Sequence, residues 1–265
     1  MCTYSKSDIN LEPDVSSKRI LIMDLKNKSV LITGSKRVGQ AVAKSLAKSG
    51  ANIAAHYNTS SKEAESLVKE LRAQGSNALS VKADVSNSVE VDKMVESVVD
   101  EFGSIDVLIT MASYFKPIKY DEITEEDWDR QISIDLKGTW LCVQAASKVM
   151  LKNGGGKIIT FSDWAVDRPY KNFLPYFVAK GGIRAMTKAL AVELAPSIQV
   201  NCILPGPVLL PEGYSEEKIK KIANSTLVKR IGSPDDIAET VKFLIEGSDF
   251  ITGAFIPVEG GRLLA

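Results

Sequence analysis

Ser29-Val-Leu-Ile-Thr-Gly-Ser-Lys-Arg-Val-Gly39 is the stretch of this 265-residue chain that decides the fold. Its first five residues read as a buried strand, and apolar residues recur beyond it at helical spacing. A glycine turn between a strand and a helix is the context in which a phosphate-binding loop is expected, with an ordinary turn as the alternative. Gly34 suits a tight turn and Gly39 suits close packing, while Arg37 stands near the place of the usual middle glycine.

Strand-like and helix-like segments alternate over the rest of the chain. Further strands are predicted at residues 52–57, 78–83, 105–111, 157–161, 198–204 and 255–258. Helices are predicted between them, one opening with a capping box of Ser60 and Glu63. A long helical region is predicted to bend near Gly138, and another helix to start at Ser233-Pro234. This alternation predicts an α/β fold: a Rossmann-like, doubly wound parallel sheet of about seven strands with helices on both faces.

The composition limits the classes of function. Residues 1–22 form a predicted polar N-terminal extension, and residues 23–265 form one predicted domain without a linker. Lys plus Arg and Asp plus Glu both number 33, which predicts no nucleic-acid partner and no anionic membrane surface. Three scattered cysteines and a single histidine, His56, predict neither a disulfide framework nor a metal site. No signal pattern or membrane-length apolar run is present, so a cytoplasmic protein is expected.

The end of the second strand predicts the cofactor. An acidic residue there would bind the ribose hydroxyls of NAD, but His56-Tyr57-Asn58-Thr59-Ser60 contains none, and Glu63 is the first. Lys36, Arg37, Thr59 and Ser60 instead suit the 2′-phosphate of NADPH. His56 lies within a strand and is interpreted as a packing or polar-rim residue rather than a catalyst.

Asp84 follows the third strand in Ala83-Asp84-Val85. Its carboxylate could reach an adenine amino group, or it could be a plain loop carboxylate.

Tyr176 and Lys180 are the candidate proton-delivery pair. They are four residues apart, so on a helix they share one face. The helix follows the fifth strand, and open α/β sheets bind ligands beyond the carboxyl ends of their strands. A second Tyr-x-x-x-Lys pattern, Tyr214 to Lys218, lies in a polar stretch and is interpreted as chance.

Together these segments resemble the short-chain dehydrogenase/reductase family. The resemblance rests on the glycine loop, Ala83-Asp84-Val85, the Tyr176/Lys180 pair, Leu204-Pro-Gly206 and Ile251-Thr-Gly253. It implies that Tyr176 is the general acid and that Lys180 lowers its pKa and holds the nicotinamide ribose. It also implies a homotetramer or homodimer built partly through the helices after Trp128.

The resemblance also places the residues expected to bind the cofactor. They are Gly34, Lys36, Arg37, Val38, Gly39, Tyr57, Asn58, Thr59, Ser60, Asp84, Val85, Ala112, Tyr176, Lys180, Pro205, Gly206 and Val208.

Several positions depart from the family pattern. Thirteen residues before Tyr176, the family's serine is replaced by Asp163, and Asp135 stands where an asparagine of the central helix is usual. The chain is similar to pteridine and dihydromonapterin reductases in Asp163, in its arginine-bearing loop, in Ala112-Ser-Tyr-Phe115 and in Gly260-Gly-Arg262. The glycine loop is one residue shorter than that pattern, and Met111 replaces an asparagine.

That similarity implies reduction of a pterin-like C=N bond with NADPH. Asp163 would then be a second acid beside Tyr176, acting with Lys180 and Asp135, although it could instead merely cap a turn. Phe115 would stack on the pterin ring, and Arg37 and Ser113 would bind its polar edge or the cofactor phosphates. The alternatives are a reductase of ketones or 3-oxoacyl thioesters and a non-catalytic nucleotide-binding protein.

Overall fold

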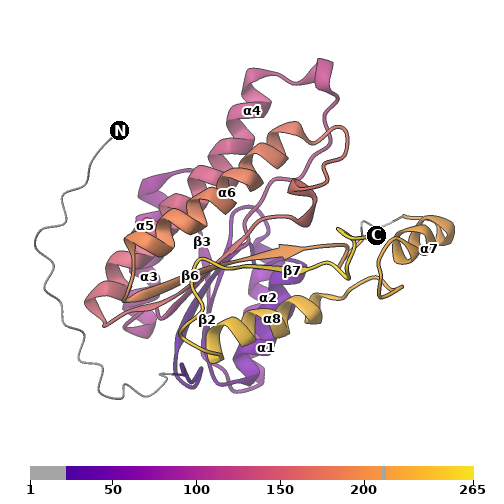
Figure 1. Cartoon of the computed structure of the whole chain (residues 1–265). Helices are drawn as coiled ribbons and strands as arrows, with labels where there is room; N and C mark the ends of the chain where they lie inside the picture. The colour runs from indigo at the N-terminus through magenta and orange to yellow at the C-terminus, as the bar shows by residue number, and fades with distance from the viewer. Residues whose placement is uncertain (1–21, 211–212) are drawn as a thin grey trace, which may run out of the picture.

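A single parallel sheet forms the centre of the molecule (Figure 1). The computed structural model describes residues 22–210 and 213–265, and the strands run in the order β3-β2-β1-β4-β5-β6-β7. Their bounds are β1 Ser29–Thr33, β2 Asn52–Tyr57, β3 Ala78–Lys82, β4 Val107–Thr110, β5 Gly156–Phe161, β6 Ile198–Pro205 and β7 Phe255–Val258. The predicted seven-stranded α/β fold is therefore confirmed. Residues 1–21 of the predicted extension lie outside the described residues.

Helices cover both faces of the sheet, as the alternation predicts. One core cluster joins the sheet to α1 (Val38–Lys48), α2 (Ser61–Ala73) and α8 (Pro234–Glu246). The other joins it to α3 (Ser88–Phe102), α5 (Gly138–Lys152) and α6 (Leu174–Glu193), and Figure 1 shows the two sets on opposite sides of the strands. Consecutive strands with crossover helices put all their carboxyl ends at one edge of the sheet, where the loops that follow them meet.

The long helical region contains an irregular turn. It consists of α4 (Glu125–Gln131), a π-helical turn (Ile132–Lys137) and α5, so the predicted bend near Gly138 is realised as a π-helix that ends directly before it. A side chain at Gly138 would put its Cβ 2.8 Å from Val85, so glycine lets this helix approach the loop after β3. Such π-helical turns occur often at functional sites, and this one carries Asp135.

Two local predictions differ from the structure. Ser60 precedes α2 but its side chain forms no capping hydrogen bond, and the Glu63 carboxylate pairs instead with Lys36 Nζ at 2.5 Å. The polar stretch around Lys218 contains a short helix, α7 (Glu216–Asn224), which Ser215 caps. The predicted helix start at Ser233 is confirmed, because its side chain forms a capping box.

The described residues also limit other classes of structure. Within 22–210 and 213–265, no helix is long and apolar enough to cross a bilayer, and no three His, Cys, Asp or Glu side chains are grouped as a metal site.

Candidate active site

The Tyr176 hydroxyl is held by a carboxylate. It donates to Asp163 Oδ2 at 2.8 Å, while Asp163 Oδ1 accepts from the Ala165 backbone N–H at 2.7 Å. Asp163 ends the segment after β5 and caps the 3-10 helix Trp164–Val166. Asp163 therefore caps a turn, and it also contacts Tyr176; its role as a second acid stays a prediction.

Asp163 and its neighbour Ser162 face opposite ways, as expected along an extended segment. The buried Ser162 hydroxyl donates to the Lys180 carbonyl at 2.8 Å, so it serves the backbone of α6. Asp163 is therefore the polar side chain that meets Tyr176 from this segment.

Lys180 belongs to α6, and its side chain reaches the π-helical turn. Its Nζ donates to the Phe161 carbonyl at 3.1 Å and lies 3.4 Å from Asp135 Oδ2. Asp135 is completely buried and also accepts hydrogen bonds from the Ser113 hydroxyl and, at 2.8 Å, from the Tyr114 N–H. Asp135 thus fixes the loop after β4 and the lysine together.

Burial controls the ionisation of this cluster. The pKa of Tyr176 is raised well above its ordinary value, first by burial and then by the negative charge of Asp163. Burial also raises the pKa of Asp163, against the opposing effects of the Ala165 N–H, the Tyr176 hydroxyl and nearby cations. The pKa of Asp135 is raised by burial too, with Lys180 opposing. The site therefore favours the protonated form of its carboxyls more than solvent does.

An aromatic wall lies beside Tyr176. The Phe115 ring stacks on Phe173 with centroids 4.5 Å apart and meets the edge of Tyr176 at 4.8 Å. Tyr170 continues the wall, 5.2 Å from Phe173. Phe115 is 51% exposed, and its stacking on a substrate stays a prediction. Phe173 and Tyr170 were not predicted, because loop residues have no periodicity.

A cavity of about 210 Å³, the candidate nucleotide cavity, lies where the loops after β1, β2, β3 and β4 meet. Its lining includes these predicted cofactor residues: Gly34, Lys36, Tyr57, Asn58, Thr59, Ser60, Asp84, Val85 and Ala112. Gly34 has φ +74°, and a Cβ on it would lie 2.7 Å from the Ala112 nitrogen. Only glycine allows this contact of loops, which fits a cradle for a nucleotide phosphate.

The His56 side chain in β2 binds the backbone of the glycine loop. Its Nδ1 accepts from the Gly34 N–H at 3.1 Å, and its Nε2 donates to the Ala83 carbonyl at 2.9 Å. The ring is buried, and burial lowers its pKa. The interpretation of His56 as a structural residue agrees with these contacts.

Several predicted residues lie differently from expectation. The Arg37 guanidinium donates to the Leu209 carbonyl at 3.3 Å and does not line the nucleotide cavity, because the shortened loop turns at Arg37 with φ +57°. The Ser113 hydroxyl is directed to Asp135, which makes it a support for the site rather than a group presented to substrate. Asp84 lines the cavity, but its Oδ1 accepts from the Ser86 backbone and hydroxyl.

The remaining residues expected to bind the cofactor lie outside the lining of this cavity. Val38 and Gly39 begin α1. Pro205 ends β6, Gly206 donates its N–H to the Val258 carbonyl, and Val208 lines a different pocket, next to β7.

Glu63 is a member of the nucleotide cavity that sequence reasoning missed. It lies in the same lining as Thr59 and Ser60 and pairs with Lys36, which lowers its own pKa. Its place six residues beyond the end of the strand, and three after Ser60, favoured a role in helix capping, and the contact with Lys36 was therefore not predicted.

Comparisons with known proteins agree with this geometry. A family model described as "Enoyl-(Acyl carrier protein) reductase" matches residues 34–262. The 3-oxoacyl-(acyl-carrier-protein) reductase of Staphylococcus aureus is 36% identical over 89% of this chain and 98% of its own. A hydroxy(phenyl)methylsuccinyl-CoA dehydrogenase subunit from Thauera aromatica is 35% identical over 91% of this chain and 99% of its own. A blue fluorescent protein from a metagenomic library, solved with NADPH, superposes with TM-score 0.84 at 29% identity, covering 91% of this chain and 99% of that one.

Proposed function

Because the chain belongs to the short-chain dehydrogenase/reductase family, we propose that it is an NADPH-dependent reductase of the ketone group of a 3-oxoacyl thioester. The observation that carries this proposal is the Tyr176 hydroxyl, placed with Lys180 beyond the carboxyl ends of the strands beside the nucleotide cavity. Two relatives whose names specify acyl-carrier-protein or CoA thioesters support the substrate class.

The nucleotide cavity supports NADPH as the cofactor. Gly34, Asn58 and Ala112 would hold the dinucleotide, and the bound nicotinamide supplies a hydride to the substrate carbon. Lys36, Thr59 and Ser60 would meet a 2′-phosphate, since β2 ends without an acidic residue. Glu63 opposes this preference, because it occupies Lys36 and adds negative charge to the same cavity.

Tyr176 supplies the proton to the carbonyl oxygen, and Asp163 supplies a proton to Tyr176. When hydride reaches the carbonyl carbon, the C=O π electrons move to oxygen, which takes the phenol proton. The phenolate that remains lies 2.8 Å from Asp163, whose carboxylic acid returns a proton to it. Lys180 stabilises the transient phenolate by its charge, and Asp135 positions Lys180. Asp163 must be protonated for this sequence, since an ionised carboxylate keeps the phenol proton.

A pterin-like C=N bond is a second candidate substrate, which Asp163 favours. Its reduction places hydride on carbon and a proton on nitrogen, and a protonated Asp163 can donate that proton directly or through water. An ionised Asp163 would oppose the alkoxide that a ketone forms. The stacked Phe115 and Phe173 rings offer a face for a flat heterocycle.

NADPH oxidation with acetoacetyl-CoA and with dihydrobiopterin, each at several concentrations, decides between these substrates. Turnover of the thioester with at least tenfold higher kcat/KM supports the first proposal, and the reverse ratio supports the pterin. If NADPH binds but neither substrate nor a panel of ketones is reduced, the chain is a non-catalytic nucleotide-binding protein.

A further inference from the structure

We propose that the substrate carries a carboxylate a few bonds from its reacting carbon and that the guanidinium of Arg262 binds this carboxylate. The inference deepens the proposed reductase function and rests on it for the class of substrate. It concerns a groove lined by Trp164 and Arg262, which none of the chemistry described above uses.

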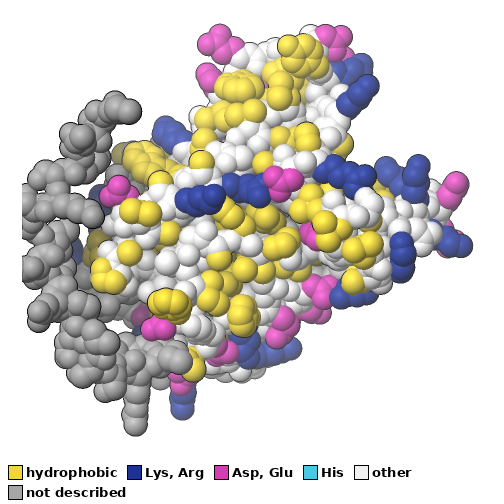
Figure 2. Space-filling view, in the orientation of Figure 1, with side chains coloured by type: hydrophobic (Ala, Val, Ile, Leu, Met, Phe, Trp, Pro, Cys, Tyr) yellow, Lys and Arg dark blue, Asp and Glu magenta, His cyan; other side chains and the backbone are white. Residues whose placement is uncertain are grey.

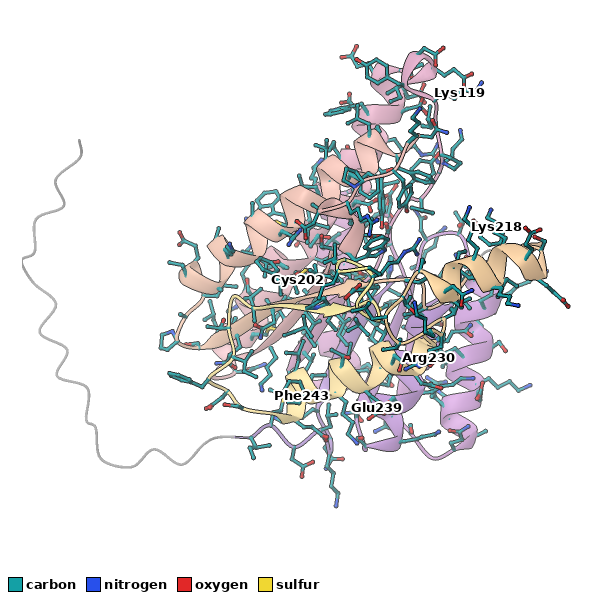
Figure 3. The ribbon with its side chains drawn as sticks, turned by 45° about the vertical axis from the view of Figure 1, so that its right-hand side comes forward. Lys119, Cys202, Lys218, Arg230, Glu239 and Phe243 are labelled. Atoms are coloured by element: carbon teal, nitrogen blue, oxygen red, sulfur yellow. The ribbon has the colours of Figure 1, made fainter. Side chains whose placement is uncertain are left out.

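The groove has a volume of about 640 Å³ and joins segments distant in sequence. Trp164 lies on one side, the segment after α7 on another, and Arg262 near the C-terminus on a third. Figure 1 shows the C-terminal strand of the chain ending beside α7, and Figure 3 shows Arg230 and Lys218 on the segment that projects there. The groove adjoins the active site, because Tyr170 in its lining packs against Phe173, which packs against Tyr176.

The lining of the groove is cationic. Arg168, Lys229 and Arg262 contribute to it, and its described lining contains no Asp or Glu side chain. Figure 2 shows Lys and Arg side chains gathered on the part of the surface that includes α7. An anionic group entering the groove therefore meets positive charge, and no Asp or Glu side chain of the described lining competes with it. An oxygen of Ala265, which also lines the groove, is already bound by Arg168.

Arg262 is the cation best placed to bind an anion. Its guanidinium carbon lies 4.6 Å from the centroid of the Trp164 ring, and Trp164 is itself buried. Stacking fixes the plane of the guanidinium and leaves its N–H edge for a bidentate oxyanion. Among the described residues, no carboxylate lies within ion-pair distance of Arg262.

The charged side chains around Arg262 already form hydrogen bonds with the backbone. The Glu259 carboxylate accepts from the Gly261 and Leu263 backbone N–H groups at 3.0 and 2.9 Å, which shapes the turn that carries Arg262. Arg168 donates to the Arg262 and Ala265 carbonyls, so it holds this segment in place. Lys229 donates to the Asn224 carbonyl at 2.9 Å.

The position of Arg262 sets the distance between the carboxylate and the ketone of the substrate. The pKa of Arg262 is lowered mainly by burial, and the charge of Asp163 acts on it in the opposite direction, which agrees with a partly desolvated cation close to the acid of the site. Because Arg262 packs on Trp164, the residue that follows Asp163, a carboxylate bound there would lie near the reacting carbon. The substrate acid is thus part of the acyl group, not the distant end of a long carrier arm.

A matched pair of ketones tests the proposal. Monoethyl 3-oxoadipate and ethyl 3-oxohexanoate have the same 3-oxo ester and differ only in a terminal carboxylate that replaces a methyl group. We expect wild type to prefer the acid by at least about tenfold in kcat/KM, the lower range for a hydrogen bond to a charged group. Arg262→Gln should bring this ratio close to one, while Lys69→Gln, which removes an equal charge from the exposed face of α2, should leave it unchanged.

Binding decides the proposal even without turnover. In a Trp128→Phe/Trp140→Phe background, the fluorescence of Trp164 reports binding of either ketone to the complex with NADP⁺, which cannot reduce them. Tighter binding of the acid that Arg262→Gln removes supports the carboxylate site even if neither ketone is reduced, a result that would count against the proposed function alone.

The proposal would be overturned if wild type bound the two ketones equally well. It would also be overturned if Arg262→Gln left the ratio of their kcat/KM values unchanged, including the case of equal losses on both ketones with a shifted pH profile. That case would mean that Arg262 acts only through Asp163.

Discussion

Asp163 Oδ2 accepts the phenolic proton of Tyr176 over 2.8 Å, so the proton that the proposed reaction needs is already engaged. The state of this carboxyl therefore decides whether Tyr176 can donate to a substrate. An ionised Asp163 retains the proton and raises the pKa of Tyr176 further, whereas a protonated Asp163 releases the phenol to donate elsewhere.

The first prediction concerns pH. Burial raises the pKa of Asp163 above its ordinary value of 3.8, so its active, protonated form persists to higher pH and is lost as pH rises through the raised pKa. We expect kcat/KM to increase as pH falls below neutral, and Asp163→Ser to flatten that increase. The measurement is a pH profile for wild type and variant with one ketone and with dihydrobiopterin.

The same variant separates the two substrate classes. Serine restores the hydroxyl usual in the family, so Asp163→Ser should lose less ketone reduction than pterin reduction. Equal losses on both substrates with an unaltered pH profile would mean that Asp163 is only the cap of the turn at Ala165.

Tyr176→Phe should lose about 10²–10⁴-fold in kcat while still binding NADPH, because only the proton donor is removed. Single-wavelength NADPH oxidation and a fluorescence titration measure the two quantities. Tyr214→Phe is the matched control, since Tyr214 also lies four residues before a lysine but packs against Lys218 on the way to α7. A Tyr176→Phe enzyme within about threefold of wild type would exclude the phenol as the acid.

Cofactor preference should depend on the Lys36–Glu63 pair. Glu63→Gln releases Lys36 and removes negative charge, so the ratio of kcat/KM for NADPH over NADH should rise, by roughly two- to fivefold for an exposed pair. Lys36→Gln should lower that ratio. Glu65→Gln, an exposed neighbour on α2, provides the control. A wild-type enzyme that uses NADH as well as NADPH contradicts the assignment of the cofactor.

His56 should make stability depend on pH. Its pKa is lowered by burial in the folded protein, so its contribution is complete above the ordinary value of 6.5 and is lost as pH falls through the lowered folded value. Protonation also removes the acceptor for the Gly34 N–H. Thermal unfolding from pH 5 to 8 should show a fall in Tm on the acid side that His56→Gln reduces. Parallel curves for the two proteins would contradict the assignment of this slope to His56.

The sheet could be predicted because its information is local. Each buried strand and each amphipathic helix is a short apolar pattern, and alternation along the chain leaves few parallel topologies. The Tyr176/Lys180 pair was found for the same reason, since four residues on one helix lie on one face.

The contacts that were missed join different segments. The Lys36–Glu63 pair connects the loop after β1 to the first turn of α2, and the local pattern at Ser60 offered Glu63 another partner. Arg37 fitted a phosphate site by composition, but the shortened loop gives it a positive φ and directs it to Leu209. Short polar α7 has no buried stripe by which a sequence could identify it.

The π-helical turn makes the direction of Asp135 depend on the number of residues between α4 and α5. Its extra residue per turn keeps α4 and α5 continuous while setting the direction in which Asp135 points. Deleting one residue between Ile132 and Lys137 would restore an ordinary helix at little cost in helical hydrogen bonds. Because the π turn absorbs one extra residue, α4 and α5 would keep their faces, and the residues of the turn itself would change direction. Asp135 would then lose its contacts with both Lys180 and Ser113, so a deletion here would abolish the site without unfolding the protein.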